Sequence, residues 1–180
     1  MATNEARTVS ASAKSSSLVD IKSLVLLAIL LAAGFILNMT LGNALAIVGI
    51  KPQFIIAAYA LTIALTDANL GQAAIYGLLS AAVIQLTTSI PGLNFATELV
   101  AALLMSVLVR TGVGRGLNPL IAAFLTTLVS GALFAVAGTV MMGAELATAV
   151  VKVPIVLGTA VFNAAVVQAL FFPLKKVLGK

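Results

Sequence analysis

Long apolar segments that follow one another almost to the C-terminus constrain this chain more than any other feature. Of its 180 residues, 62% are hydrophobic and 8% are charged, and the mean hydropathy is +1.21. Soluble domains carry about 25% charged residues, whereas apolar runs of about 17 to 25 residues are typical of membrane-spanning helices. The sequence therefore predicts an all-α integral membrane protein.

Turn signals and polar stretches divide the chain into a tail and six transmembrane helices. Residues 1–20 are rich in Ser, Ala and Thr and predict a disordered cytoplasmic tail, with Asp20 as the N-cap of the first helix. Residues 21–180 are predicted to form one six-helix transmembrane domain. The second helix starts at Pro52 and is short for a full span, so it either thins the bilayer locally or lies sheltered behind longer helices. The predicted helices cover residues 21–41, 52–66, 71–89, 95–110, 117–142 and 154–173, and residues 143–153 form an outward connection.

Basic residues concentrate on one side of the predicted membrane. Short cytoplasmic loops carry an excess of Lys and Arg. With six helices and an internal N-terminus, eight of the ten basic residues fall inside, and only Lys51 and Lys152 fall outside. The inverted arrangement is disfavoured, so both termini are predicted to be cytoplasmic. The eight internal basic residues are Arg7, Lys14, Lys22, Arg110, Arg115, Lys175, Lys176 and Lys180.

The residue types that are missing exclude several classes of site. Cys and His are absent, which removes disulfides, thiol nucleophiles and most transition-metal sites, together with the commonest general base near neutral pH. The sequence contains no P-loop, and its glycine-rich run at 112–116 is typical of a turn. We therefore expect no cofactor, no metal and no enzyme activity, and we expect any ATP hydrolysis to occur on another chain.

Four charged residues lie on the predicted outer side, and their charges sum to zero. Lys51, Glu98 and Lys152 lie near the ends of predicted helices, where they can face a water-filled cavity at small energetic cost. A lysine and Glu98 could together bind the carboxylate and the ammonium of a zwitterion. Glu98 is the strongest candidate, because an ionisable residue beside an apolar run indicates function. For Lys152 and Glu145 we expect interfacial anchoring, since lysines at helix ends often extend toward water.

Uncharged polar and aromatic residues extend this candidate site. Asn163 lies in the middle of the sixth predicted helix, where its amide needs a hydrogen-bond partner from another helix or from a ligand. Three aromatic residues could stack on an aromatic ligand, although aromatic residues are also expected at the interfaces of any membrane protein. Bridging between helices is an equally open role for the amides. The candidates are Gln53, Phe54, Tyr59, Phe95 and Asn163, with Asn38, Asn43 and Gln85 as further polar residues near the outer side.

Ala28 and Ala32 lie four positions apart in the first predicted helix. Small residues at this spacing let two helix backbones approach closely in a membrane. Similar pairs occur elsewhere in this alanine-rich chain, so spacing alone does not distinguish internal packing from a contact with a partner.

Taken together, these features resemble a known family. Six short spans, cytoplasmic termini, the Ala28-x-x-x-Ala32 pair and the absence of a nucleotide site resemble the substrate-binding S components of energy-coupling factor (ECF) transporters. The stretch Gly49-Ile50-Lys51-Pro52-Gln53, and Thr87-Thr88-Ser89-Ile90-Pro91-Gly92 through Glu98, are similar to the tryptophan-transporter branch. The resemblance covers about residues 20–178. The chain departs from that branch at Gln53, where the branch favours an acidic residue.

The resemblance implies both a function and partners. S components bind one micronutrient from outside the prokaryotic plasma membrane and associate with a scaffold subunit and two ATPase subunits. The expected substrate is a small zwitterionic aromatic molecule, with tryptophan the best candidate. The alternatives are an S component for another vitamin or micronutrient, or a stand-alone secondary transporter. Membrane lipid is a further expected partner. No nucleic-acid partner is expected. By resemblance, Ala28 and Ala32 meet the scaffold, and Lys51, Asn94, Glu98 and Asn163 contact the ligand.

Overall fold

The structure is a computed structural model that describes residues 19–46, 52–113 and 115–179. Most of the predicted tail and the candidate ligand residue Lys51 lie outside the described residues. The described chain is helical and contains no strand. Its elements are α1 (Ile21–Leu37), the π-helical turn η1 (Asn38–Gly42), α2 (Asn43–Ala46), α3 (Phe54–Thr66), α4 (Leu70–Ile84), α5 (Leu93–Thr111), the 3₁₀ turn η2 (Arg115–Leu117), α6 (Asn118–Met141), α7 (Ala147–Val150) and α8 (Val153–Val177).

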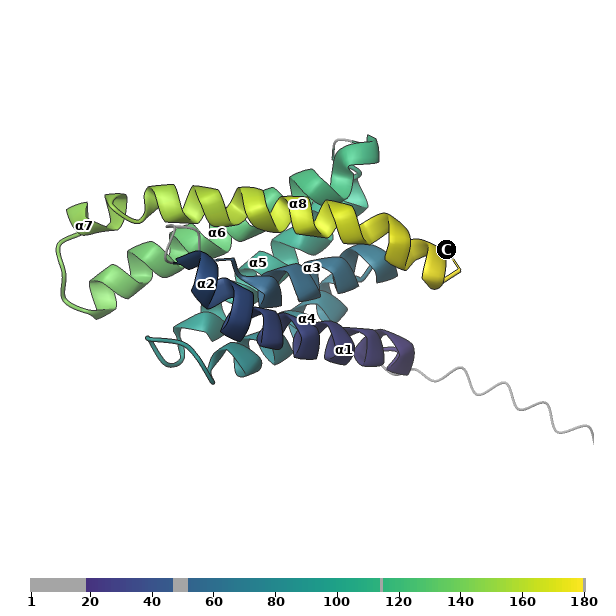
Figure 1. Cartoon of the computed structure of the whole chain (residues 1–180), viewed down its shortest axis with the longest axis horizontal. Coiled ribbons are helices and arrows are strands. Elements are labelled where there is room, and N and C mark those ends of the chain that lie inside the picture. Colours follow the sequence, from purple (N-terminus) through teal and green to yellow (C-terminus); the bar gives the residue numbers. More distant parts are fainter. Residues whose placement is uncertain (1–18, 47–51, 114, 180) are drawn as a thin grey trace, which may run out of the picture.

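The short helix α3 forms the centre of the bundle (Figure 1). Every residue from 54 to 65 is buried, and α1, α4, α5, α6 and α8 all contact this helix. A helix that is apolar on all sides is stable only when other helices or lipid surround it. Its threonine hydroxyls are satisfied within the helix: Thr62 donates to the Ala58 carbonyl over 2.9 Å, and Thr66 donates to the Thr62 carbonyl over 2.7 Å. Of the two arrangements predicted for this segment, the structure has the sheltered one.

Glycines allow the helices around α3 to approach closely. A Cβ atom at Gly34 of α1 would lie 2.9 Å from the Phe54 carbonyl oxygen at the start of α3. A Cβ atom at Gly77 of α4 would lie 2.7 Å from Cβ of Ala102 in α5. Both contacts are too short for any larger residue without movement of a helix, so these glycines fix the α1–α3 and α4–α5 spacings.

The bundle has two distinct ends (Figure 1). The start of α1, the α3–α4 and α5–α6 connections and the end of α8 lie together, and we call this the terminal end. The α4–α5 connection (residues 85–92) and residues 142–152 lie at the opposite end, which we call the distal end. The described chain therefore begins and finishes at the same end of the bundle.

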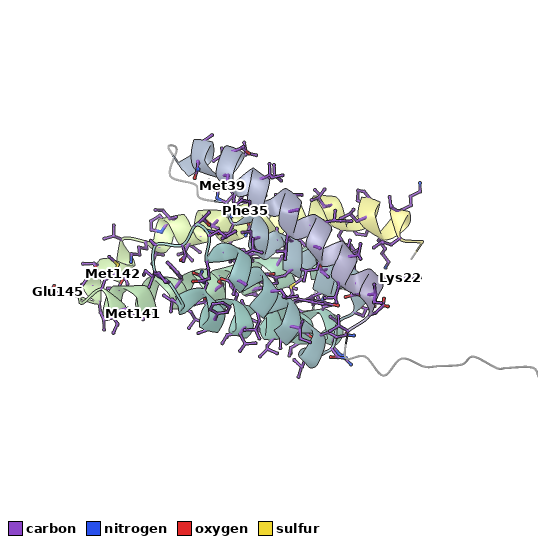
Figure 2. All side chains as sticks on the ribbon, turned by 90° about the horizontal axis from the view of Figure 1, so that it is seen from below. Lys22, Phe35, Met39, Met141, Met142 and Glu145 are labelled. Carbon is purple, nitrogen blue, oxygen red and sulfur yellow. The ribbon has the colours of Figure 1, made fainter. Side chains whose placement is uncertain are left out.

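Four helical segments are long and apolar enough to cross a membrane: Ile21–Leu45, Leu93–Thr111, Asn118–Met141 and Ala147–Val177. Large apolar side chains cover the outer surface between the two ends, as Figure 2 shows for the region between Lys22 and Met141. The prediction of a helical protein with membrane-spanning helices is confirmed at this level. The apolar helices α3 and α4 are shorter, with 13 and 15 residues, so six crossings stay a prediction.

Several predicted helix boundaries were wrong for identifiable reasons. The first helix does not end at residue 41, because the π-helical turn carries it on into α2. The third ends at Ile84 rather than at 89, where the Thr87 and Thr88 hydroxyls bond to nearby backbone carbonyls and favour a turn. The last continues past Pro173 to Val177, because one proline removes only one hydrogen bond from a 25-residue helix. Asp20 lies at the N-cap position but makes no side-chain capping bond.

Candidate ligand-binding cavity

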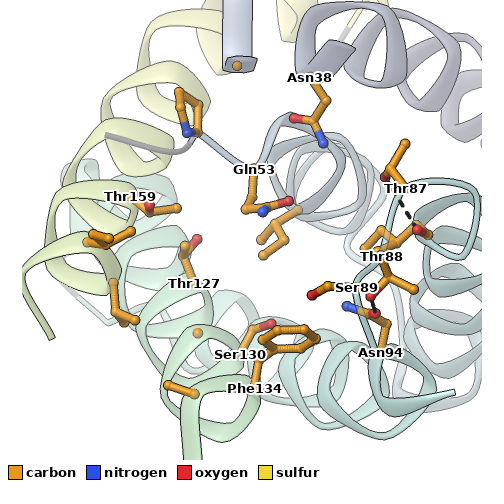
Figure 3. Close-up of a pocket in the computed structure, with 18 of the residues that line it drawn as sticks. Asn38, Gln53, Thr87, Thr88, Ser89, Asn94, Thr127, Ser130, Phe134 and Thr159 are labelled. Carbon is orange, nitrogen blue, oxygen red and sulfur yellow. Dashed lines mark hydrogen bonds between the residues drawn. The ribbon is translucent and has the colours of Figure 1, made fainter. Parts of the chain in front are cut away.

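A cavity of about 400 Å³ opens among the helices at the distal end (Figure 3). Its lining comes from η1, the start of α3, the α4–α5 connection, α5, α6 and α8. The short central helix creates this space. With 13 residues α3 is about 20 Å long, whereas α6 with 24 residues is about 36 Å long. Pro52, Gln53 and Ile56 line the cavity, which therefore lies over the beginning of α3.

Glu98 of α5 is the buried carboxylate of this cavity. It lines the cavity but is only 2% exposed. Its Oε1 accepts hydrogen bonds from the Ser130 hydroxyl at 2.7 Å and from the Thr97 hydroxyl at 3.3 Å, and its Oε2 accepts one from the Tyr59 hydroxyl at 2.9 Å. Three donors thus compensate the loss of water around the carboxylate. The structure brings Glu98 to the cavity, as a ligand contact would require.

Asn94 also lines the cavity, one helical turn before Glu98. Its Oδ1 accepts a hydrogen bond of 2.6 Å from the Thr88 hydroxyl in the α4–α5 connection. The same connection is closed by a 2.9 Å bond from the Gly92 amide to Oε1 of Gln85. Ile90 of this connection reaches α6, since a Cβ atom at Gly138 would lie 2.7 Å from its Cδ1. The connection is therefore tied to both helices that flank the cavity.

Two predicted amides have different roles. The Gln53 side chain lines the cavity (Figure 3). Asn163 of α8 is fully buried and is not part of the lining. Its Nδ2 donates to the Gln53 carbonyl at 3.1 Å and its Oδ1 accepts from the Gln53 amide at 3.3 Å, so it holds the backbone beneath the cavity in place. Asn38 of η1 does the same from the other side, since its Oδ1 accepts from the Phe54 amide at 2.8 Å.

The three aromatic residues predicted to flank a ligand are not brought to the cavity. The Phe54 ring packs edge to face against Phe162 at 5.6 Å between centroids. Tyr59 is fully buried behind Glu98, and Phe95 is 39% exposed on the outside of α5. The aromatic ring that does line the cavity in the described chain is Phe134 of α6 (Figure 3).

Phe134 was missed by the sequence analysis, although a signal existed. The cavity-lining face of α6 also includes Thr127, Ser130, Gly131 and Ala135, which recur at intervals of three or four residues within an apolar segment. Such a stripe of small and polar residues marks one helix face. The stripe alone would not have distinguished a cavity from a helix contact.

Lys152 lies on the wall of the cavity, although its predicted role was interfacial anchoring. Lys152 is half-buried and lines the cavity together with Glu98. In the described part of the chain, these two are the only charged residues that line the cavity. Its Nζ donates a hydrogen bond of 3.0 Å to the Thr139 hydroxyl. Glu145 is exposed in the connection between α6 and α7 and does not line the cavity.

Ala28 and Ala32, the predicted docking residues, lie on the exposed side of α1. The opposite side of this helix buries Leu27, Leu31 and Gly34 against the bundle. The two alanines therefore form part of a continuous exposed strip in which no described helix contacts them closely enough to bury them. This placement leaves them free for the surrounding membrane or for another protein.

The cavity combines one carboxylate, one ammonium, several amides and hydroxyls, and one aromatic ring on largely apolar walls. No group of three or more acidic residues that could hold a metal ion occurs among the described residues. Such a lining suits an organic molecule that carries polar ends and an apolar body. Comparison of the chain with protein-family models, with curated proteins and with solved structures finds no match.

Proposed function

We propose that this chain is the substrate-binding S component of an ECF-type importer in a prokaryotic plasma membrane. It captures a small zwitterionic aromatic substrate from outside, and tryptophan is the best candidate. In this arrangement the six apolar helices cross the membrane, both termini are cytoplasmic and the cavity faces outward.

The distribution of charge supports this orientation. Only Lys152 among the described basic residues lies at the distal end, next to the cavity. Cytoplasmic loops are enriched in Lys and Arg, so the terminal end is the cytoplasmic one. The basic residues of the terminal end are Lys22, Arg110, Arg115, Lys175 and Lys176.

The observation that carries the proposal is Glu98, a buried carboxylate that faces a cavity of ligand size. Small-molecule sites commonly enclose about 300–1,000 Å³, and this cavity encloses about 400 Å³. Glu98 receives the substrate ammonium, Gln53 and Asn94 provide further polar contacts, and the Phe134 ring lies against the aromatic body. Lys51, which lies outside the described residues, is the sequence-based candidate for the carboxylate.

The partners are those that the family resemblance implies, a scaffold subunit and two ATPase subunits. The chain has no P-loop for ATP, so in an ATP-driven importer hydrolysis takes place on those separate subunits. The exposed Ala28 and Ala32 offer a smooth helix surface to the scaffold subunit, because small side chains permit close helix contact in a membrane.

Binding and transport experiments test this function separately. The purified chain should be stabilised against heat by L-tryptophan in a screen of amino acids and B vitamins. Proteoliposomes that contain the chain with an ECF scaffold and ATPases should take up the bound compound only when ATP is supplied. Stabilisation by a vitamin instead would change the substrate and keep the family. Uptake by the chain alone, driven by an ion gradient, would replace the proposal with a secondary transporter.

A further inference from the structure

We propose that Lys152 is the anchor for the carboxylate of the substrate and that it determines selectivity for acids over amines. This inference rests on the proposed function. From its position at the end of a helix alone, Lys152 would be expected to serve only as a membrane anchor.

A buried hydroxyl positions the ammonium of Lys152. Lys152 immediately precedes α8, and its Nζ donates to Oγ1 of Thr139 on α6 at 3.0 Å. The Thr139 hydroxyl in turn donates its own proton to the Ala135 carbonyl at 2.6 Å. Because that proton is engaged, Oγ1 presents a lone pair to Lys152. The ammonium has three donors, and this bond uses one of them.

The direction of the side chain argues against simple anchoring. A lysine that anchors a helix end extends its charge toward water. The Lys152 ammonium instead bonds to Thr139, whose exposed fraction is 1%. The charge of Lys152 therefore lies at the wall of the cavity and does not extend away from the protein.

The ammonium has no carboxylate partner in the described part of the chain. Glu98 lines the same cavity, yet its two oxygens accept from Tyr59, Ser130 and Thr97 and form no ion pair with Lys152. Partly desolvated charges are stabilised by a nearby opposite charge. A substrate carboxylate would supply the opposite charge that the Lys152 ammonium lacks.

Three related ligands separate these contacts. We would measure dissociation constants by calorimetry for L-tryptophan, for tryptamine, which lacks the carboxylate, and for indole-3-propionate, which lacks the ammonium. The wild-type chain should prefer L-tryptophan over tryptamine by at least about tenfold, since hydrogen bonds between charged groups are among the strongest polar contacts. Lys152→Met should remove that preference by weakening L-tryptophan binding, with tryptamine changed less than about twofold.

Two further variants keep the test decisive. Thr139→Val removes the acceptor that positions the ammonium and should produce a smaller loss with the same ligand selectivity, even if Lys152→Met fails to fold. Lys175→Met, at the other end of the bundle where its Nζ lies 5.6 Å from the Phe171 ring centroid, should leave all three affinities unchanged.

The outcomes distinguish this inference from the proposed function. If Lys152→Met lost affinity equally for L-tryptophan and tryptamine, or lost none, the anchor would be overturned. Binding of L-tryptophan by the wild type would then still support the proposed function. The anchor would also be overturned if Lys51→Met, and not Lys152→Met, lost the preference for L-tryptophan over tryptamine. If the wild type binds none of the three compounds, both the anchor and the assigned substrate fail together.

Discussion

The Tyr59 hydroxyl donates a 2.9 Å hydrogen bond to Oε2 of Glu98 and so joins the central helix to α5 below the cavity. Tyr59 is fully buried and Glu98 is nearly so. The contact fixes one oxygen of the carboxylate from the side opposite the cavity. In the proposed function, Tyr59 acts on the ligand through Glu98 rather than by stacking on it.

Removing that hydroxyl should weaken both the bundle and the site. In Tyr59→Phe the Glu98 carboxylate loses one donor, and a net hydrogen bond contributes about 1 kcal/mol. We expect a lower melting temperature in detergent and ligand affinity reduced about fivefold. Tyr76 is the matched control, because its hydroxyl is buried without a partner. Tyr76→Phe should leave stability equal or higher, and an equal loss in both variants would refute the specific role of Tyr59.

Replacing Glu98 by Gln should weaken ligand binding at least about tenfold while the protein remains folded. The substitution keeps the size of the side chain but removes the charge that receives an ammonium, which is worth about 1.5–3 kcal/mol as a charged hydrogen bond. Calorimetry with L-tryptophan measures the effect. Glu145→Gln, on the exposed distal connection, should bind as the wild type does. Unchanged affinity in Glu98→Gln would remove Glu98 from the site.

Asn163→Leu should lower stability more than it changes ligand selectivity. Its amide bonds to both the N–H and the carbonyl of Gln53. Leu removes both bonds and leaves the Gln53 N–H without this acceptor, whereas the carbonyl still accepts from the Ile56 and Ala57 amides. An unpaired buried polar group costs about 1–3 kcal/mol. Thermal unfolding should show this loss. If stability were unchanged and L-tryptophan binding alone were lost, Asn163 would be a ligand contact instead.

Gly34→Ala should separate α1 from α3. The added methyl group would meet the Phe54 carbonyl oxygen at 2.9 Å, and overpacking costs about 1–3 kcal/mol. We expect a clear drop in melting temperature. Gly71→Ala is the control, since its new Cβ would meet only the Asn69 side chain at 3.4 Å. Comparable melting temperatures for the two variants would contradict the tight α1–α3 contact.

Changing Ala28 and Ala32 together to Trp should abolish copurification with the ECF scaffold and ATPases. The bulky rings would prevent close approach of a partner helix, whereas the cavity at the distal end is untouched, so ligand binding should survive. Ala82→Trp, on an exposed position of α4, should still copurify. A complex that forms normally with the double variant would place the docking surface elsewhere.

The sequence predicted the helices well because their signals are local. Apolar runs, the turn around Pro91-Gly92 and the polar residues at 66–71 are visible without knowing the fold. Errors arose where tertiary or side-chain contacts decide the boundary, as at Ile84 and after Pro173. The two short helices could not be placed from length alone, since burial of α3 depends on five other helices.

The site was predicted less completely. Glu98 and Gln53 stand out as polar residues in apolar surroundings, and both line the cavity. The direction of a side chain around a helix axis depends on how that helix packs, so the sequence could not show that Tyr59 lies behind Glu98. For the same reason Phe134 was missed, and Lys152 was expected to face water.

The burial of α3 also bears on how the protein is made. This helix is synthesised before α4, α5, α6 and α8, which together with α1 enclose it. The Tyr59 hydroxyl therefore acquires Glu98 as its acceptor only after α5 has been synthesised, and the Gln53 backbone acquires Asn163 only with α8. The cavity is completed by α8, which is translated after the other helices that line it, so a chain that stops before α8 has a central helix without its full enclosure and an incomplete cavity.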